Sequence, residues 1–101
     1  MDEDMLARSQ AQAEICRIFS NPLRIQILWT LDEGEMSVSE LSLAIGATVP
    51  NTSHQLRLMK DRDIVTSRRE GQTVQYQLNR KSDIECLLQK SPKATRAQNS
   101  T

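Results

Sequence analysis

The side chains best suited to chemistry lie in one stretch, residues 48–63, and the chemistry they suit is the reading of nucleic-acid base edges. If this stretch is a helix, apolar residues at spacings of three and four form one side that can be buried, namely Val49, Thr52, Leu56 and Met59. The opposite side is polar and carries Asn51, His54, Gln55, Arg57 and Arg62. Asparagine, glutamine and arginine are the side chains best suited to base edges in the DNA major groove. The alternative is an ordinary surface helix with a solvated polar side, and the neighbouring elements must decide between the two.

The residues just before this stretch have the spacing of a helix-turn-helix. Thr48 can cap the candidate helix, and Pro50 is tolerated in the first turn because backbone N–H groups there lack helical partners. Upstream, Ser37 and Glu40 form a capping-box pattern that begins a short helix ending near Ile45. Two short helices joined by a glycine-containing turn match the helix-turn-helix, whose second helix enters the groove.

The residues after the stretch predict a β-hairpin. Two extended runs, residues 64–69 and 73–78, flank a glycine-containing turn, and the second run alternates apolar and polar side chains. Arg68, Arg69 and Gln72 lie beside the tip, where such a wing can contact phosphates or the minor groove. The alternative is that the two arginines only keep an edge strand soluble.

Three further helices are expected, at residues 3–19, 22–33 and 81–90. The second is apolar around most of its circumference, which is typical of a central helix. From residue 91 onward there is no apolar periodicity, which predicts a disordered tail over residues 91–101. The expected fold is therefore α+β and mostly α: a winged helix-turn-helix over residues 1–90, with helices before and after the DNA-binding elements.

Charge is distributed unevenly, although the 101-residue chain is neutral as a whole. Residues 1–40 hold eight acidic and three basic residues, whereas residues 51–81 hold seven basic and three acidic ones. A positive surface around a candidate recognition helix is the electrostatic footprint of DNA binding. Overall neutrality predicts binding that is modest and strongly salt-dependent.

Other classes of function find little support in the composition. The chain has one histidine, no nucleophile–base constellation and no glycine-rich phosphate loop, so we expect neither an enzyme nor a cofactor. There is no run of about 18 apolar residues, so no membrane span is expected. The acidic start lacks the basic and apolar regions of a signal peptide, which favours a cytoplasmic protein.

Residues 19–78 resemble the ArsR–SmtB family of winged helix-turn-helix repressors. The matching pieces are Asn21-Pro22-x-Arg24, Ile27-Leu28, Ser37-Val38-x-Glu40-Leu41, Ser53-x-x-Leu56, Ile64-Val65, Arg69-Glu70-Gly71 and Tyr76-x-Leu78. The resemblance implies a homodimer joined through its first and last helices, with two recognition helices on an inverted repeat of double-stranded DNA. By position it implies that the DNA-facing residues are Thr48, Asn51, Ser53, His54 and Gln55.

Two departures from the family pattern concern the DNA-binding elements. Gln55 stands where the family usually has histidine, which could alter base preference. Asp63 stands where a glycine is common before the wing. Because aspartate tolerates left-handed backbone better than most residues, we expect the turn to survive.

A third departure concerns sensing. Many relatives carry a Cys-x-Cys metal site on the first helix of the helix-turn-helix, but here both thiol positions are serines, Ser37 and Ser39. Serine hydroxyls are poor ligands for soft metals. Another family site uses Asp and His pairs on the last helix, which here offers Asp83 and Glu85 but no histidine. We therefore expect no metal site of either usual kind.

The two cysteines, Cys16 and Cys86, lie on the helices that the resemblance assigns to the dimer interface. Some relatives sense oxidants through a cysteine pair, so one alternative is a thiol-based redox-sensing repressor. The other interpretation is that both are small buried hydrophobes, as free cysteines often are. A second functional alternative is a winged-helix module for protein interaction, with any DNA binding incidental.

Overall fold

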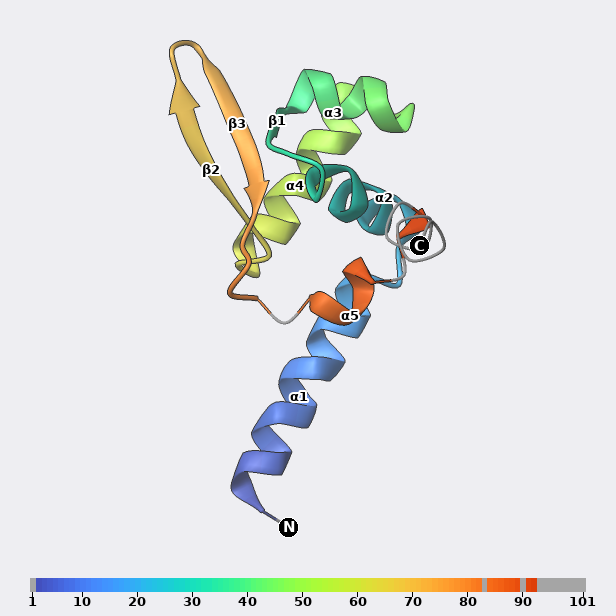
Figure 1. The fold of residues 1–101 in the computed structure, drawn as a ribbon, viewed down its shortest axis with the longest axis vertical. Coiled ribbons are helices and arrows are strands. Elements are labelled where there is room, and N and C mark those ends of the chain that lie inside the picture. Colours follow the sequence, from blue (N-terminus) through green and yellow to red (C-terminus); the bar gives the residue numbers. More distant parts are fainter. Residues whose placement is uncertain (1, 83, 90, 93–101) are drawn as a thin grey trace, which may run out of the picture.

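The computed structural model describes residues 2–82, 84–89 and 91–92, and in it the helices lie to one side of a small antiparallel sheet, whose hairpin forms an edge of the molecule (Figure 1). The elements are α1 (Glu3–Ile18), α2 (Pro22–Leu31), β1 (Met36–Ser37), α3 (Val38–Ile45), α4 (Val49–Asp61), β2 (Val65–Glu70), β3 (Thr73–Leu78) and α5 (Glu85–Leu88). The mostly helical winged helix-turn-helix predicted from the sequence is confirmed.

Side-chain caps set where the helices begin. The Asn21 side chain accepts the N–H of Leu23 at 2.8 Å, with Pro22 in the first turn of α2. The capping box of α3 is present, since the Ser37 hydroxyl accepts the Glu40 N–H at 3.2 Å and the Glu40 carboxylate accepts the Ser37 N–H at 3.0 Å. Asp63, at φ 59°, holds the left-handed turn before the wing, as predicted.

The core lies where α2 meets α3, α4 and the base of the sheet. Its most deeply buried members come from all of these elements, which explains why α2 is apolar on several sides. Among the described residues, five apolar ones are 0% exposed: Ile27, Leu28, Leu41, Leu56 and Met59. Packing against this core holds α4 in a fixed orientation.

The sheet has three strands in the order β1-β3-β2, and the two-residue strand β1 was not predicted. Met36 in β1 pairs with Tyr76 in β3, a run too short to show any alternation in the sequence. In the hairpin, Val65 pairs with Leu78 at the base, and both are buried. The other end is exposed and extends beyond the helices (Figure 1). The wing is therefore anchored at its base and open at its tip.

The two outer helices differ in how much of the body they contact. Helix α1 projects away from the other elements (Figure 1), and its Met5 and Leu6 are 61% and 45% exposed. Helix α5 is shorter than predicted, and it is tied to α2 by a hydrogen bond of 2.9 Å from Trp29 Nε1 to the Leu87 carbonyl. Residues 93–101, most of the predicted tail, lie outside the described residues. Among the helices that the structure describes, none is long and apolar enough to cross a membrane.

Candidate nucleic-acid interface

Helix α4 presents a polar face to solvent at its N-terminal end. Thr48 caps it, with its hydroxyl accepting the Asn51 N–H at 3.2 Å. The side chains of Asn51, His54 and Arg57 are exposed, while Thr52, Leu56 and Met59 on the apolar side are buried. The predicted division of the helix into two faces holds for these residues. Val49, predicted on the same buried side, is 44% exposed because it lies in the first turn, where α4 extends beyond the core. Ser53 lies between the two faces and is half-buried.

Gln55 is the exception, and its predicted place on the exposed side was wrong. It is only 7% exposed, and its Oε1 accepts a hydrogen bond of 2.7 Å from Nε of Arg24 on α2. Its amide nitrogen donates to Oδ1 of Asn51 at 3.3 Å. Gln55 follows Thr52 by three residues and precedes Met59 by four, and both of these are fully buried. The helical spacing therefore indicated the buried side, but the polarity of the side chain was given more weight.

Arg62, which was also predicted on the polar side, is turned toward α1. It forms an ion pair with Glu14, and the same carboxylate accepts a hydrogen bond from Arg17 at 2.7 Å. Leu58, half-buried, lines the hollow between these side chains and α4. These contacts fasten the C-terminal half of α4 to α1 and leave the N-terminal half as the open end.

The two wing arginines are in different situations. Arg68 is bound by acid groups: it forms a double hydrogen bond with Glu35 in the segment before β1, and it lies 3.1 Å from Glu70. The hydrogen bonds to Glu35 raise the pKa of the Arg68 guanidinium above its ordinary value. Arg69 is exposed and makes one long hydrogen bond, 3.4 Å, to the Gly71 carbonyl. Arg69, with exposed Gln72 in the turn, is therefore the more available cation at the tip.

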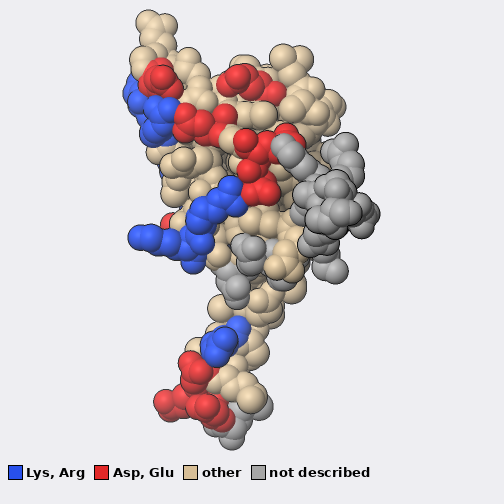
Figure 2. Space-filling model, in the orientation of Figure 1, with Lys and Arg blue, Asp and Glu red and all other residues tan. Residues whose placement is uncertain are grey.

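Basic and acidic groups lie close together over the hairpin. Figure 2 shows lysine and arginine side chains gathered on the side where Figure 1 places β2 and β3, with acidic side chains next to them. Lys60 on α4 donates to the Ser67 hydroxyl on β2 at 2.7 Å, which links helix and wing. Helix α4 and the wing are therefore joined on this side, where part of the positive charge is already neutralised by Glu35 and Glu70.

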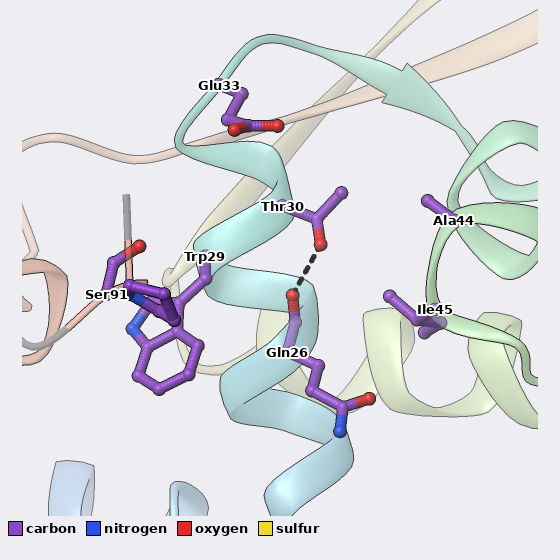
Figure 3. A pocket seen from close by; sticks show the side chains of 8 residues that line it. Gln26, Trp29, Thr30, Glu33, Ala44, Ile45 and Ser91 are labelled. Carbon is purple, nitrogen blue, oxygen red and sulfur yellow. Dashed lines mark hydrogen bonds between the residues drawn. The ribbon is translucent and has the colours of Figure 1, made fainter. Parts of the chain in front are cut away.

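A hollow of about 340 Å³ lies between α2 and α3. Figure 3 shows Trp29 and Gln26 on α2 and Ala44 and Ile45 on α3 around it. The Thr30 hydroxyl donates to the Gln26 carbonyl at 2.7 Å, and the Trp29 N–H is taken by α5. These side chains thus support the helix packing, and Trp29 serves to hold the last helix against the body.

Comparison with known proteins decides the family. A family model described as "Bacterial regulatory protein, arsR family" matches residues 21–67. The biofilm growth-associated repressor of Xylella fastidiosa is 38% identical over 76 residues, which are 75% of this chain and 67% of that protein. The chain belongs to the arsR family. Like its relatives in the arsR family, it is a DNA-binding transcriptional regulator.

Solved structures agree over nearly the whole chain. The transcriptional repressor BigR from Xylella fastidiosa is similar with a TM-score of 0.79 and 32% identity, covering 98% of this chain and 97% of that one. Reduced HlyU from Vibrio cholerae gives a TM-score of 0.77 and 28% identity, covering 85% of this chain and 90% of that one. The arsR-family similarity therefore extends beyond the residues of the family model to include α1 and the wing.

The serines at the family's thiol positions have structural partners here. Ser37 caps α3, and the carbonyl of Ser39 accepts the Ser42 hydroxyl at 2.9 Å. Within the described part of the chain, no group of three His, Cys, Asp or Glu residues could hold a metal ion. Asp83 and the side chain of Glu85 lie outside that part.

Of the two cysteines, the structure describes the side chain of Cys16 only. Cys16 is exposed on α1, where its sulfur accepts a hydrogen bond of 3.7 Å from Nε2 of Gln12. This exposure contradicts the interpretation of Cys16 as a buried hydrophobe within the single chain. The side chain of Cys86 lies outside the described residues. Redox sensing through the two cysteines therefore stays a prediction.

Proposed function

We propose that this arsR-family regulator is a repressor that acts as a homodimer on an inverted-repeat operator in double-stranded DNA. The observation that carries the proposal is the exposed polar face of α4 beside a basic wing. Helix α4 would enter the major groove with Asn51, His54 and Arg57, while Thr48 and Ser53 lie at its edges. Two of the proteins named above, the biofilm growth-associated repressor and BigR, are described as repressors, which favours repression over activation.

The wing would contact the backbone rather than the bases. Arg69 and Gln72 are exposed at the tip, so they can reach phosphates on the flank of the recognised groove. Arg68 would contribute less, because Glu35 already engages its guanidinium. The proposed backbone contact therefore depends mainly on Arg69.

The dimer would form through α1 and α5. Helix α1 exposes Met5 and Leu6 while projecting from the body, an arrangement that a second copy could cover. One structural neighbour from Mycobacterium bovis, 23% identical with a TM-score of 0.76, is described as homodimeric. A two-fold dimer would match two recognition helices to two half-sites about one helical turn apart.

Binding to selected operator duplexes tests the DNA contacts. Asn51→Ala should relax sequence preference at one position in each half-site, since it removes an exposed amide. Arg69→Ala should weaken binding to all sequences alike and reduce the salt dependence, because a phosphate contact carries no sequence information. Gln26→Ala is the matched control, because it removes the same kind of exposed amide from α2. If the Asn51 and Arg69 variants bind as well as wild type, the fold serves protein interaction instead.

Sedimentation of the purified protein tests the dimer. Leu6→Asp places a charge on the exposed apolar part of α1 and should shift the protein to monomer. Leu43→Asp makes the same change on α3, at a leucine that is 85% exposed, and should leave the dimer intact. A dimer that persists in the Leu6 variant and dissociates in the Leu43 variant would place the interface on α3.

A further inference from the structure

A chain of hydrogen-bonded side chains runs from the end of α1 to the proposed DNA-binding face of α4. Arg24 on α2 donates through Nη1 to the Ile18 carbonyl at 2.9 Å and through Nε to Oε1 of Gln55 at 2.7 Å. Gln55 in turn donates through Nε2 to Oδ1 of Asn51 at 3.3 Å. Asn51 is exposed, whereas Gln55 is buried and Arg24 is half-buried. The last member of this chain is thus the residue proposed above to read a base.

Chemistry fixes the direction of every hydrogen bond in the chain. A guanidinium has donors and no acceptor, so only the amide oxygen of Gln55 can face Arg24. The amide nitrogen of Gln55 must then face Asn51, and a donor there requires the oxygen of Asn51. Because this hydrogen bond turns Oδ1 toward Gln55, the end of the amide that Asn51 presents outward to a ligand is its NH₂, which donates.

We infer that Arg24 and Gln55 are specificity-determining positioning residues, which make Asn51 a hydrogen-bond donor toward the DNA. An unrestrained asparagine reads adenine with both ends of its amide, accepting from N6 and donating to N7. An asparagine that presents its NH₂ outward and its oxygen inward suits guanine better, because both major-groove groups of guanine, N7 and O6, are acceptors. The inference rests on the proposed contact of Asn51 with a base. It predicts guanine at the base pair that depends on Asn51.

A substitution at Gln55 can reverse the chain without changing its shape. Gln55→Glu keeps an oxygen for Arg24 but replaces the donor with a second acceptor. Asn51 must then turn its NH₂ inward to reach the carboxylate, and its oxygen faces the DNA. The preferred base should change from guanine to one that presents an amino group in the major groove, adenine or cytosine. A residue that only stabilised the fold would change stability or overall affinity, but not the identity of the preferred base.

The experiment is selection of bound duplexes from a random library, followed by competition between duplexes that differ at one position. Wild type should prefer guanine at one half-site position, and Asn51→Ala should lose that preference. Gln55→Glu should reverse the guanine-to-adenine ratio there by about tenfold or more, within the range expected for one good side-chain pair. In the Asn51→Ala background Gln55→Glu should cause no such reversal. Gln26→Glu makes the same chemical change on α2 and should leave the preference intact.

The outcomes separate this inference from the proposed function. If Asn51→Ala loses a base preference but Gln55→Glu retains guanine, the inference is wrong and the DNA contact of Asn51 stands. A wild-type preference for adenine at the Asn51-dependent position would also overturn it. If Asn51→Ala changes no position, both the contact and the inference fail. If Gln55→Glu does not fold, Gln55→Met can be used, since it frees the Asn51 amide to rotate. The discrimination between guanine and adenine should then disappear. If the Gln55→Met variant keeps this discrimination, the inference is wrong.

Discussion

The ion pair between Glu35 and Arg68 should hold a wing arginine away from DNA. Glu35 offers both carboxylate oxygens to Arg68, and Glu70 lies 3.1 Å from the same guanidinium. Arg68 and Glu35 are both partly exposed, so phosphate and carboxylate compete for the arginine in water. We predict that Glu35→Gln strengthens DNA binding, because it removes a negative charge beside the wing and frees Arg68 for phosphate.

The size of the effect follows from counterion release. One added phosphate contact steepens the dependence of log affinity on log salt by about 0.9. In the proposed dimer two wings gain one contact each, so the slope should steepen by at most about 1.8. Between about 50 and 200 mM salt, the advantage of the Glu35→Gln variant should therefore fall by up to about 12-fold. Because Glu70 remains beside Arg68, this value is an upper bound.

Titration of an operator duplex at several salt concentrations measures the slope directly. Asp63→Asn is the matched control, since it removes one negative charge at the other end of the hairpin and asparagine also tolerates the left-handed backbone there. Arg68→Ala should change affinity little in the wild-type chain but should cancel the gain in the Glu35→Gln background. The reasoning is refuted if Arg68→Ala alone weakens binding as much as Arg69→Ala and Glu35→Gln leaves the slope unchanged. Arg68 would then already contact phosphate in the complex.

Three predictions concern the fold. Thr52→Val should raise the free energy of unfolding by about 1 kcal/mol in chemical denaturation, because the buried Thr52 hydroxyl has no hydrogen-bond partner among the described residues. A lower free energy of unfolding would instead show that the hydroxyl is hydrogen-bonded in solution. Trp29→Phe should lower the free energy of unfolding by about 1 kcal/mol, because it removes the hydrogen bond to the Leu87 carbonyl. The rate of hydrogen exchange should then increase more in α5 than in α3. Hydrogen bonds from the Ser37 N–H and hydroxyl lower the pKa of the Glu40 carboxyl. The ionised Glu40 should therefore stabilise the fold fully above the ordinary glutamate pKa, and this stabilisation should be lost as the pH falls through the lowered pKa of the folded state. The stability difference between wild type and Glu40→Gln should therefore shrink in acid, and a difference independent of pH would contradict this.

Local chemistry made much of the fold predictable. Caps and turns depend on residues a few positions apart, so the starts of α2, α3 and α4 and the turn at Asp63 could be predicted from neighbouring residues. Strand β1 could not, because a two-residue pairing with β3 leaves no periodic pattern. The length of α5 was overestimated for a related reason: a short amphipathic stretch gives a weak periodic signal, and its ends depend on packing.

The candidate site was predictable only to the extent that exposure follows polarity. Asn51, His54 and Arg57 are polar and exposed, as the pattern indicates. The state of Arg68 was not predictable, since its partner Glu35 is 33 residues away and belongs to another element. The same holds for Gln55 and Arg24, which are 31 residues apart. In each case the sequence supplies the charged or polar group, and only the tertiary structure supplies its partner.

Gln55 shows why the tertiary partner of a polar side chain matters for function as well as for packing. A polar residue at a buried helical spacing requires a partner, because an unpaired buried amide is costly. When the partner is an arginine, which only donates, the orientation of the amide follows, and with it the orientation of the next amide on the same helix face. In the inferred arrangement, Arg24 would therefore influence base selection without contacting a base. Relatives that differ at this position would differ in sequence preference even if every residue on the exposed face of α4 were the same.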